Sequence, residues 1–277
     1  MTNQPIPRVC GVPEHFNRAW RTMGAGAVIE WQEVPEGTGR MLDLLSSGVT
    51  DIAILLTEGA IAGAARGIDL SVIGVWVETP LNWGVHVPAA SSFHQPNDVV
   101  DRRVAVSRMG SGSHLMAGIY ARQHGWKMPV DYVTVDTLEG ARVAFAEDRA
   151  DVFLWERATT APLVAAGEFR RIDILPTPWP CFVACCHRDI AHEQRRALSA
   201  LVGTALDEAN NMATDTDAVS AFSNEYGLDQ AEISQWLAQT RWANTVGVDP
   251  EMLSGVQATL LDIGLTERAL DIDKLIT

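Results

Sequence analysis

The sequence predicts an α/β protein of two lobes, each a mostly parallel sheet flanked by helices, joined by a two-strand hinge, with a C-terminal helical segment packing on the first lobe. Three observations support this. The chain opens with three β-loop-α units, and the rhythm breaks at two long apolar runs, 70–77 and 81–87, with no helix between them. It resumes at residue 102 and ends in a helical tail, 192–277. Alternating strands and helices are typical of parallel sheets covered by helices. We expect residues 1–85 and 182–277 to form lobe 1 and residues 86–181 to form lobe 2.

The first lobe is predicted to begin with strands at 8–12, 28–34 and 51–55, which are short apolar runs bounded by turn residues. Pro13 opens the first helix, and Phe16, Trp20 and Met23 share one helical face. A second helix begins at Thr38 or Gly39. Thr57, a residue type that caps helices well, begins a third.

The second lobe repeats the rhythm. Strands are expected at 104–107, 132–135 and 152–155, with helices at 113–124, 138–146 and 157–166. Two further strands, 171–175 and 181–186, flank the proline-rich residues 176–180, which we interpret as the return crossing. Apolar residues at helical spacing, such as Leu198, Val202 and Leu206, then continue through the tail.

Composition excludes several classes of protein. The 277 residues, 47% of them hydrophobic, can bury a sizeable core, yet no window approaches the apolar length of a membrane span. A net charge of −14 with only 21 scattered Lys and Arg argues against nucleic-acid binding. Residues 1–7 have neither a cationic start nor an apolar core, so the chain as it stands is expected in the cytoplasm, or in the periplasm if a signal segment was removed.

Four cysteines occur, and three of them lie in one apolar run that ends at His187: Cys181, Cys185 and Cys186. The run indicates a buried strand in a reducing compartment. The alternative is a metal or redox cluster, but the spacing matches no common zinc pattern. We therefore expect no metal and no cofactor.

The stretch 102–125 carries the clearest chemical pattern, namely a short strand, a Gly- and Ser-rich loop and the start of a helix. First-turn backbone amides, together with the hydroxyls of Ser111 and Ser113, can converge on an oxygen-rich ligand, and Arg108 adds a positive charge. The competing interpretation is an ordinary loop in which a serine only caps the helix. The pattern alone leaves both open.

Several short motifs, in their order and spacing, resemble the type II periplasmic substrate-binding proteins that serve aliphatic sulfonates, taurine and thiamine-pyrimidine precursors in ABC importers. The residues that carry the resemblance are Thr38–Gly39–Arg40–Met41 with Leu45, Gly48 and Asp51–Ile52–Ala53; Pro80–Leu81–Asn82–Trp83–Gly84; Val104 to Gly112; and Ala150–Asp151–Val152 with Trp155 and Glu156. The resemblance covers nearly the whole chain. It implies a small-molecule ligand held between the lobes and, if the chain is exported, an ABC importer as partner.

In that family, loops at the carboxyl ends of the strands face the ligand, as they do in open α/β sheets generally. Transferred position by position, the resemblance implies a ligand-binding set of nineteen residues: His15, Asn17, Gly37, Thr38, Gly39, Thr57, Glu58, Asn82, Trp83, Arg108, Gly110, Ser111, Gly112, Ser113, His114, Asp136, Thr137, Trp155 and Glu156.

Each of these residue types also has a structural explanation. His15 could be a surface residue, helix dipoles favour an acid such as Glu58 in a first turn, and tryptophans such as Trp155 fill cores. Capping alone could explain Asp136 and Thr137. Taken together, a guanidinium, a helix N-terminus, three acids and aromatic faces favour a small polar or zwitterionic ligand, such as an amino-substituted heterocycle or a sulfonate or carboxylate.

No nucleophile, base and orienting residue form a recognisable set, so we expect non-catalytic capture of a metabolite by lobe closure. An enzyme on the same fold is the alternative, because the resemblance extends to a pyrimidine synthase of thiamine synthesis, to menaquinone-pathway enzymes and to a sulfinate desulfinase. In the last case Cys10, near His15, would be the nucleophile. A ligand-sensing module is a third possibility.

Overall fold

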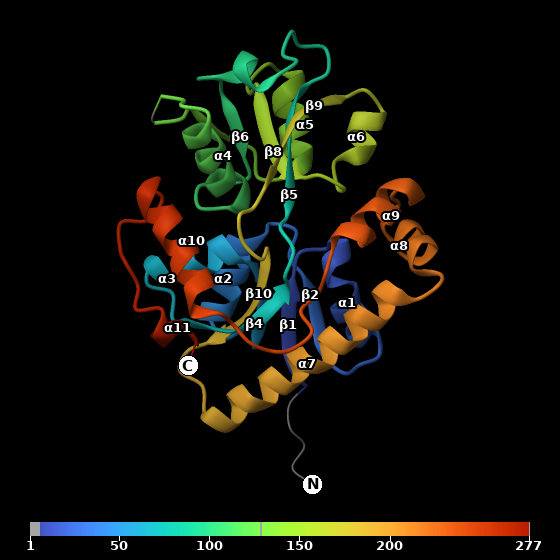
Figure 1. Ribbon diagram of the computed structural model, residues 1–277, viewed down its shortest axis with the longest axis vertical. Coiled ribbons are helices and arrows are strands. Elements are labelled where there is room, and N and C mark those ends of the chain that lie inside the picture. The colour runs from blue at the N-terminus through green and yellow to red at the C-terminus, as the bar shows by residue number, and fades with distance from the viewer. Residues whose placement is uncertain (1–5, 128, 277) are drawn as a thin grey trace.

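The structure, a computed structural model, describes residues 6–127 and 129–276 and consists of two α/β lobes stacked along the long axis (Figure 1). Residues 1–5 and 277 of the expected lobe 1, and residue 128 of the expected lobe 2, lie outside the described residues. Each lobe is built on one five-stranded sheet with helices against it, so the two-lobe α/β prediction is confirmed.

The sheet of lobe 1 has the strand order β2-β1-β3-β10-β4. Its strands are β1 (Arg8–Gly11), β2 (Glu30–Glu33), β3 (Ile52–Leu56), β4 (Leu70–Val77) and β10 (Phe182–His187). The central strand β3 is buried at every position, whereas the edge strand β2 is mostly exposed. Helices α1 (Arg18–Ala25), α2 (Thr38–Ser46) and α3 (Thr57–Ala65) follow β1, β2 and β3, and a short 3-10 turn, His15–Asn17, precedes α1.

The sheet of lobe 2 has the order β7-β6-β8-β5-β9. Its strands are β5 (Asn82–Pro88), β6 (Val104–Val106), β7 (Tyr132–Thr134), β8 (Val152–Glu156) and β9 (Phe169–Pro176). Its helices are α4 (Gly112–Gln123), α5 (Leu138–Ala146) and the short α6 (Ala161–Ala165), and a 3-10 turn, Pro96–Val99, precedes β6.

Both sheets are mixed but mostly parallel, as predicted, because four of the five strands in each sheet run in the same direction. The strand that arrives by a hinge crossing runs antiparallel to both of its neighbours: β10 between β3 and β4, and β5 between β8 and β9. The other pairings are parallel. Because β5 lies wholly in the second sheet, we propose that the lobes divide at residues 78–81 and 177–181, where the chain crosses.

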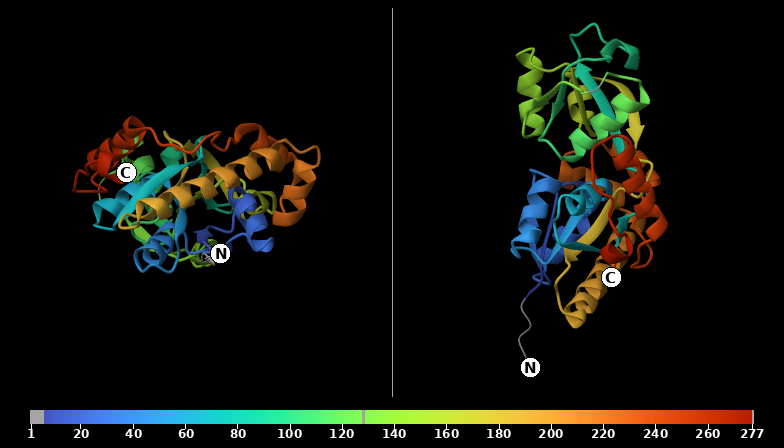
Figure 2. Two further views of the ribbon diagram at one scale, coloured as in Figure 1. Left: turned by 90° about the horizontal axis from the view of Figure 1, so that it is seen from below. Right: turned by 90° about the vertical axis from the view of Figure 1, so that its left-hand side faces the viewer.

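The C-terminal segment packs on lobe 1, as predicted, and it also contacts lobe 2. It comprises α7 (His192–Thr214), α8 (Ala218–Tyr226), α9 (Gln230–Gln239), α10 (Pro250–Asp262) and α11 (Asp273–Ile276). Helix α7 lies along lobe 1, while α9 and the end of α10 reach lobe 2 (Figures 1 and 2). Arg157 of lobe 2 donates to Glu232 and Gln235 of α9 at 2.9 and 2.7 Å.

The segment between α9 and α10 also runs beside the hinge. Trp242 forms a β-bridge with Val77, the amide of Glu78 donates to the carbonyl of Arg241, and the amide of Arg241 donates to Thr79. The amide of Cys181, in the second crossing, donates to the carbonyl of Thr79, so three stretches of chain lie together where the lobes meet.

Candidate functional site

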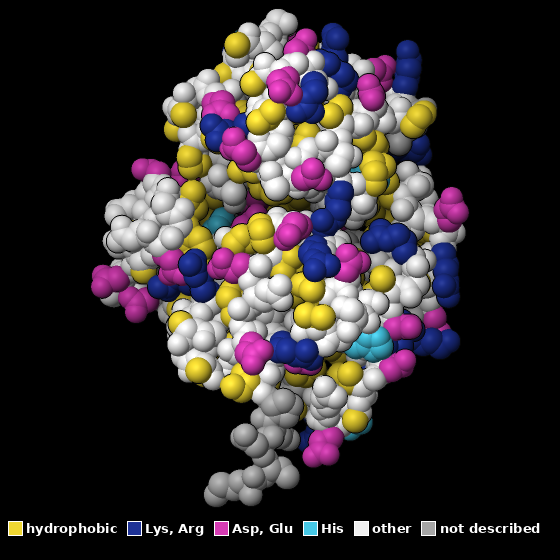
Figure 3. Space-filling view, turned by 180° about the vertical axis from the view of Figure 1, so that it is seen from behind, with side chains coloured by type: hydrophobic (Ala, Val, Ile, Leu, Met, Phe, Trp, Pro, Cys, Tyr) yellow, Lys and Arg dark blue, Asp and Glu magenta, His cyan; other side chains and the backbone are white. Residues whose placement is uncertain are grey.

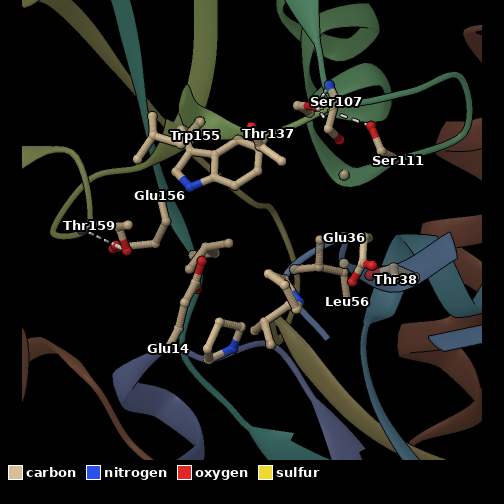
Figure 4. A pocket seen from close by; sticks show the side chains of 18 of the residues that line it. Glu14, Glu36, Thr38, Leu56, Ser107, Ser111, Thr137, Trp155, Glu156 and Thr159 are labelled. Atoms are coloured by element: carbon tan, nitrogen blue, oxygen red, sulfur yellow. Dashed lines mark hydrogen bonds between the residues drawn. The ribbon is translucent and has the colours of Figure 1, made fainter. Parts of the chain in front are cut away.

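A cavity of about 280 Å³ lies between the lobes, and loops from both sheets line it (Figure 4). Lobe 1 contributes residues that follow β1 and β2 and the last residue of β3, and lobe 2 contributes residues that follow β6 and β7 and residues at and after the end of β8. The strand ends therefore converge, as expected for ligand sites in α/β proteins.

One wall is rich in hydrogen-bond donors. Helices α2, α4 and α5 begin at Thr38, Gly112 and Leu138, and all three residues line the cavity. First-turn amides have no partner within their own helix, and the helix dipole makes this end positive. This wall therefore favours an oxyanion or another electron-rich group.

The Gly- and Ser-rich loop is held by its own hydroxyls. Ser111 caps α4, because its oxygen accepts from the amide of His114, and it donates to the carbonyl of Arg108 at 2.7 Å. Ser113 accepts from the amide of Ser107 at 2.9 Å and lies 3.0 Å from the oxygen of Ser111. Capping and a role in lining the cavity, which the sequence left as alternatives, thus coexist here.

Gly112 brings the two lobes into close approach. A Cβ on this residue would lie 2.4 Å from Leu56 Cδ1 and 3.0 Å from a ring carbon of Trp83. A side chain at this position would have to displace Leu56 or Trp83, so glycine permits the close approach of α4 to the end of β3.

The opposite wall is acidic. Glu156 ends β8 and accepts three hydrogen bonds, from the amides of Ala158 and Thr159 at 2.9 and 2.6 Å and from the Thr159 hydroxyl at 2.8 Å. Glu14, in the loop after β1, extends toward it from the other lobe (Figure 4). Burial, and next the nearby Glu156, raise the pKa of the Glu14 carboxyl to about 8.

Aromatic and aliphatic side chains fill the space between these walls. Trp155 is half-buried and stacks on Phe153 with ring centroids 5.2 Å apart, and its indole borders the cavity (Figure 4). Trp83 is buried, and Leu56, Leu81 and Phe182 complete a mostly apolar lining. Such a surface suits a flat ligand that is partly apolar.

Nine of the nineteen residues implied by the resemblance line this cavity: Gly37, Thr38, Trp83, Ser111, Gly112, Ser113, Thr137, Trp155 and Glu156. Thr137 caps α5 by accepting from the amide of Gly140.

Four others are buried in lobe 1. The His15 ring packs 4.1 Å from that of Trp236, and burial lowers its pKa. Asn17 donates to the carbonyl of Val12. Thr57 is the first residue of α3 and not its N-cap, which is Leu56; its hydroxyl instead donates to the carbonyl of Pro180 at 2.5 Å. Glu58 accepts from Trp179 Nε1 at 2.8 Å.

The remaining six lie around the cavity rather than in its lining. Arg108 crosses to lobe 1, where its Nη2 donates to the carbonyl of Gly37 at 3.3 Å and its guanidinium covers Gly39. The amide of Gly110 donates to His114 Nδ1 at 3.0 Å. Asn82 lines a smaller groove behind the cavity, and Asp136 is exposed.

Twelve of the lining residues lie outside the set of nineteen: Val12, Pro13, Glu14, Pro35, Glu36, Leu56, Leu81, Ser107, Leu138, Glu139, Thr159 and Phe182. Ser107 directly follows β6, and Glu14 lies three residues after the end of β1, so the strand-end rule covers both. Apolar residues such as Leu56 and Phe182 could not be told from core residues.

The four cysteines are free and buried. Burial raises the pKa of Cys10 to about 12, so its thiol is not ionised at neutral pH, and this environment does not favour a nucleophile. Within 6–127 and 129–276, no group of three or more His, Cys, Asp or Glu could hold a metal ion.

On the face shown in Figure 3, Lys and Arg are interspersed with Asp and Glu and form no continuous basic stripe. The same face is hollowed between the lobes. No helix in the part of the chain that the structure describes is long and apolar enough to cross a membrane.

Comparisons with known proteins agree on the fold. A family model described as Ca3427-like PBP, a periplasmic-binding-protein family, matches residues 83–175. No curated protein matches the chain.

Similar solved structures include the Candida albicans CA3427 gene product, described as having the generic periplasmic binding protein fold. It is 24% identical, with a TM-score of 0.87 over 99% of this chain and 96% of that one. The alkanesulfonate-binding protein SsuA of Xanthomonas axonopodis pv. citri, bound to MOPS, is 17% identical, with a TM-score of 0.79 over 100% and 99%. The ligand-binding component of an ABC-type import system of Staphylococcus aureus is 14% identical, with a TM-score of 0.76 over 99% and 97%.

Proposed function

We propose, from the premise that this chain has the fold of type II periplasmic binding proteins, that it binds a small polar or zwitterionic metabolite between its lobes without transforming it. The observation that carries this proposal is the cavity itself, which strand-end loops and helix N-termini of both lobes line together. A ligand there would contact both lobes at once, so binding and closure would be linked.

The two kinds of wall support a ligand with two kinds of polar group. First-turn amides and serine hydroxyls favour an electron-rich group, whereas Glu14 and Glu156 favour an amino or amidine group. The alkanesulfonate-binding neighbour was solved with MOPS, a molecule that carries both an amine and a sulfonate. We propose the same nineteen residues as the starting set for mutagenesis, with Glu14 added.

The partner that we propose follows from the same neighbours. If the chain is exported, an ABC importer would receive its ligand, since the Staphylococcus aureus neighbour is the ligand-binding component of such an import system. If it stays in the cytoplasm, it would act as a binding or sensing module.

The experiment combines thermal-shift screening over a broad metabolite library, small-angle scattering, and native mass spectrometry of gently purified protein. We expect at least one compound to raise the Tm and to reduce the radius of gyration. If no compound does either, and no small molecule is retained, the proposal is refuted.

A matched pair of variants ties any binding to this cavity. Trp155→Leu removes an aromatic face worth about 1–2 kcal/mol and should weaken binding roughly 5- to 30-fold. Trp31→Leu, on the edge strand β2 away from the cavity, should leave the affinity unchanged. Equal losses in both variants would place the ligand elsewhere.

A further inference from the structure

The charged residues that line the cavity are unusual for a site expected to hold an anion. Its lining contains four acidic residues, Glu14, Glu36, Glu139 and Glu156, and no Lys, Arg or His among the residues described. Arg108, the expected cation, is directed to the carbonyl of Gly37 instead. Glu36 and Glu139 are exposed, and Glu139 pairs with Arg142 at 2.6 Å, so the missing positive charge matters at Glu14 and Glu156.

Two of the acids come from opposite lobes. Glu14 follows β1 of lobe 1, and Glu156 ends β8 of lobe 2. Figure 4 shows both on the same side of the cavity, below and beside the indole of Trp155. Like charges that converge across a gap oppose closure, whereas a cation between them favours it.

The two carboxyls have different surroundings. Glu156 accepts three hydrogen bonds. No hydrogen bond reaches the Glu14 carboxyl from the residues described, and burial raises its pKa, so the empty cavity favours the protonated form of Glu14. The indole of Trp155 beside them presents a face on which a flat cation can stack.

We propose that the ligand carries a planar, delocalised cation of the amidinium type, which binds between Glu14 and Glu156 against Trp155. This inference rests on the proposed function and adds to it the chemistry of one end of the ligand.

The predicted pH dependence follows from the groups around Glu14. Glu156 faces it from β8, His15 is its neighbour in sequence, and Cys181 approaches from the second crossing; both His15 and Cys181 are held neutral by burial. Since burial raises the pKa of the Glu14 carboxyl to about 8 in the empty site, binding a cation at pH 7 should release part of a proton, and affinity should rise by about 10-fold or more from pH 6 to pH 8.

The experiment uses three probes of one shape and different charge: benzamidine, benzamide and benzoate. Isothermal titration calorimetry in two buffers of different ionisation enthalpy measures both the affinity and the protons released. We expect benzamidine to bind at least 10-fold more tightly than benzamide at pH 8, and benzoate to bind most weakly.

Variants complete the test. Glu14→Gln, which resembles the protonated acid and should fold normally, is expected to abolish proton release and the dependence on pH, and to weaken benzamidine binding. Glu30→Gln, on the exposed edge strand β2, is the control and should change neither.

The failures are distinguishable. Binding of benzamide or benzoate as tight as that of benzamidine, no measurable benzamidine binding, or benzamidine binding without proton release would overturn this inference and leave ligand capture standing. If the metabolite screen also finds neither stabilisation nor compaction, the proposed function fails as well.

Discussion

Glu58 is a buried carboxyl whose ionisation should make folding stability depend on pH. Its Oε2 accepts from Trp179 Nε1 at 2.8 Å, and its Oε1 has no partner among the residues described. Burial is the largest effect and raises the pKa to about 7 from an ordinary value of 4.5, although the bond from Trp179 opposes this shift. Between pH 4.5 and about 7, the Glu58 carboxyl is therefore mostly protonated in the native protein and mostly ionised in the unfolded chain.

The sign and size follow by linkage. Between pH 4.5 and 7 the native state binds one more proton than the unfolded state, so the free energy of unfolding falls as pH rises through this window. At 1.36 kcal/mol per pKa unit, the full effect is about 3 kcal/mol, of which about 2 kcal/mol falls between pH 5.5 and pH 8.

Glu58→Gln keeps an acceptor for Trp179 and removes the ionisation. Relative to the wild type, we expect the free energy of unfolding of the variant to increase by about 2 kcal/mol as the pH rises from 5.5 to 8. Urea unfolding at each pH measures this difference. Glu14 also titrates in this range but is present in both proteins, so its contribution cancels. Glu30→Gln, which is exposed, should follow the wild type. Parallel pH profiles for the wild type and Glu58→Gln would refute the reasoning.

Three further predictions concern closure and reactivity. In Gly39→Ala, the new Cβ would lie 2.8 Å from Arg108 Nε, so we expect ligand affinity to fall about 5- to 30-fold while the Tm stays within a few degrees; unchanged affinity in calorimetry would count against this contact. Arg157→Met removes the ion pair with Glu232 at 2.9 Å and should enlarge the radius of gyration of the unliganded protein in small-angle scattering, and an unchanged radius would contradict a bracing role. Cys10 should react with iodoacetamide at least 100-fold more slowly in the native than in the unfolded protein, whereas similar rates would show an accessible thiolate.

Much of the fold could be predicted because each element carries its own local pattern. The apolar run of β4 and the helical spacing of α5 gave their observed bounds, Leu70–Val77 and Leu138–Ala146. The direction of a strand relative to its neighbours could not be predicted in the same way. The antiparallel placement of β10 depends on how residues 177–181 return from lobe 2, and no local pattern encodes that path.

Some residues of the candidate site could likewise be predicted from local sequence, and others could not. Glu156 and Trp155 could be proposed because polar and aromatic residues at a strand end stand out against the strand. In sequence, His15 and Glu58 also stand out as polar residues near strand ends. Their burial depends on contacts with Trp236 and Trp179, which lie more than one hundred residues further along the chain. Leu56 lines the cavity and yet has the character of any core residue.

The bridge between Val77 and Trp242 bears on how the molecule can deform. Two crossings alone would let the lobes both swing and rotate about the long axis. A third stretch that is hydrogen-bonded beside them should resist rotation about the long axis. The lobes would then open and close by bending in a single plane. Severing the chain after α9 should release that constraint, so the severed protein would sample twisted arrangements that the intact one does not.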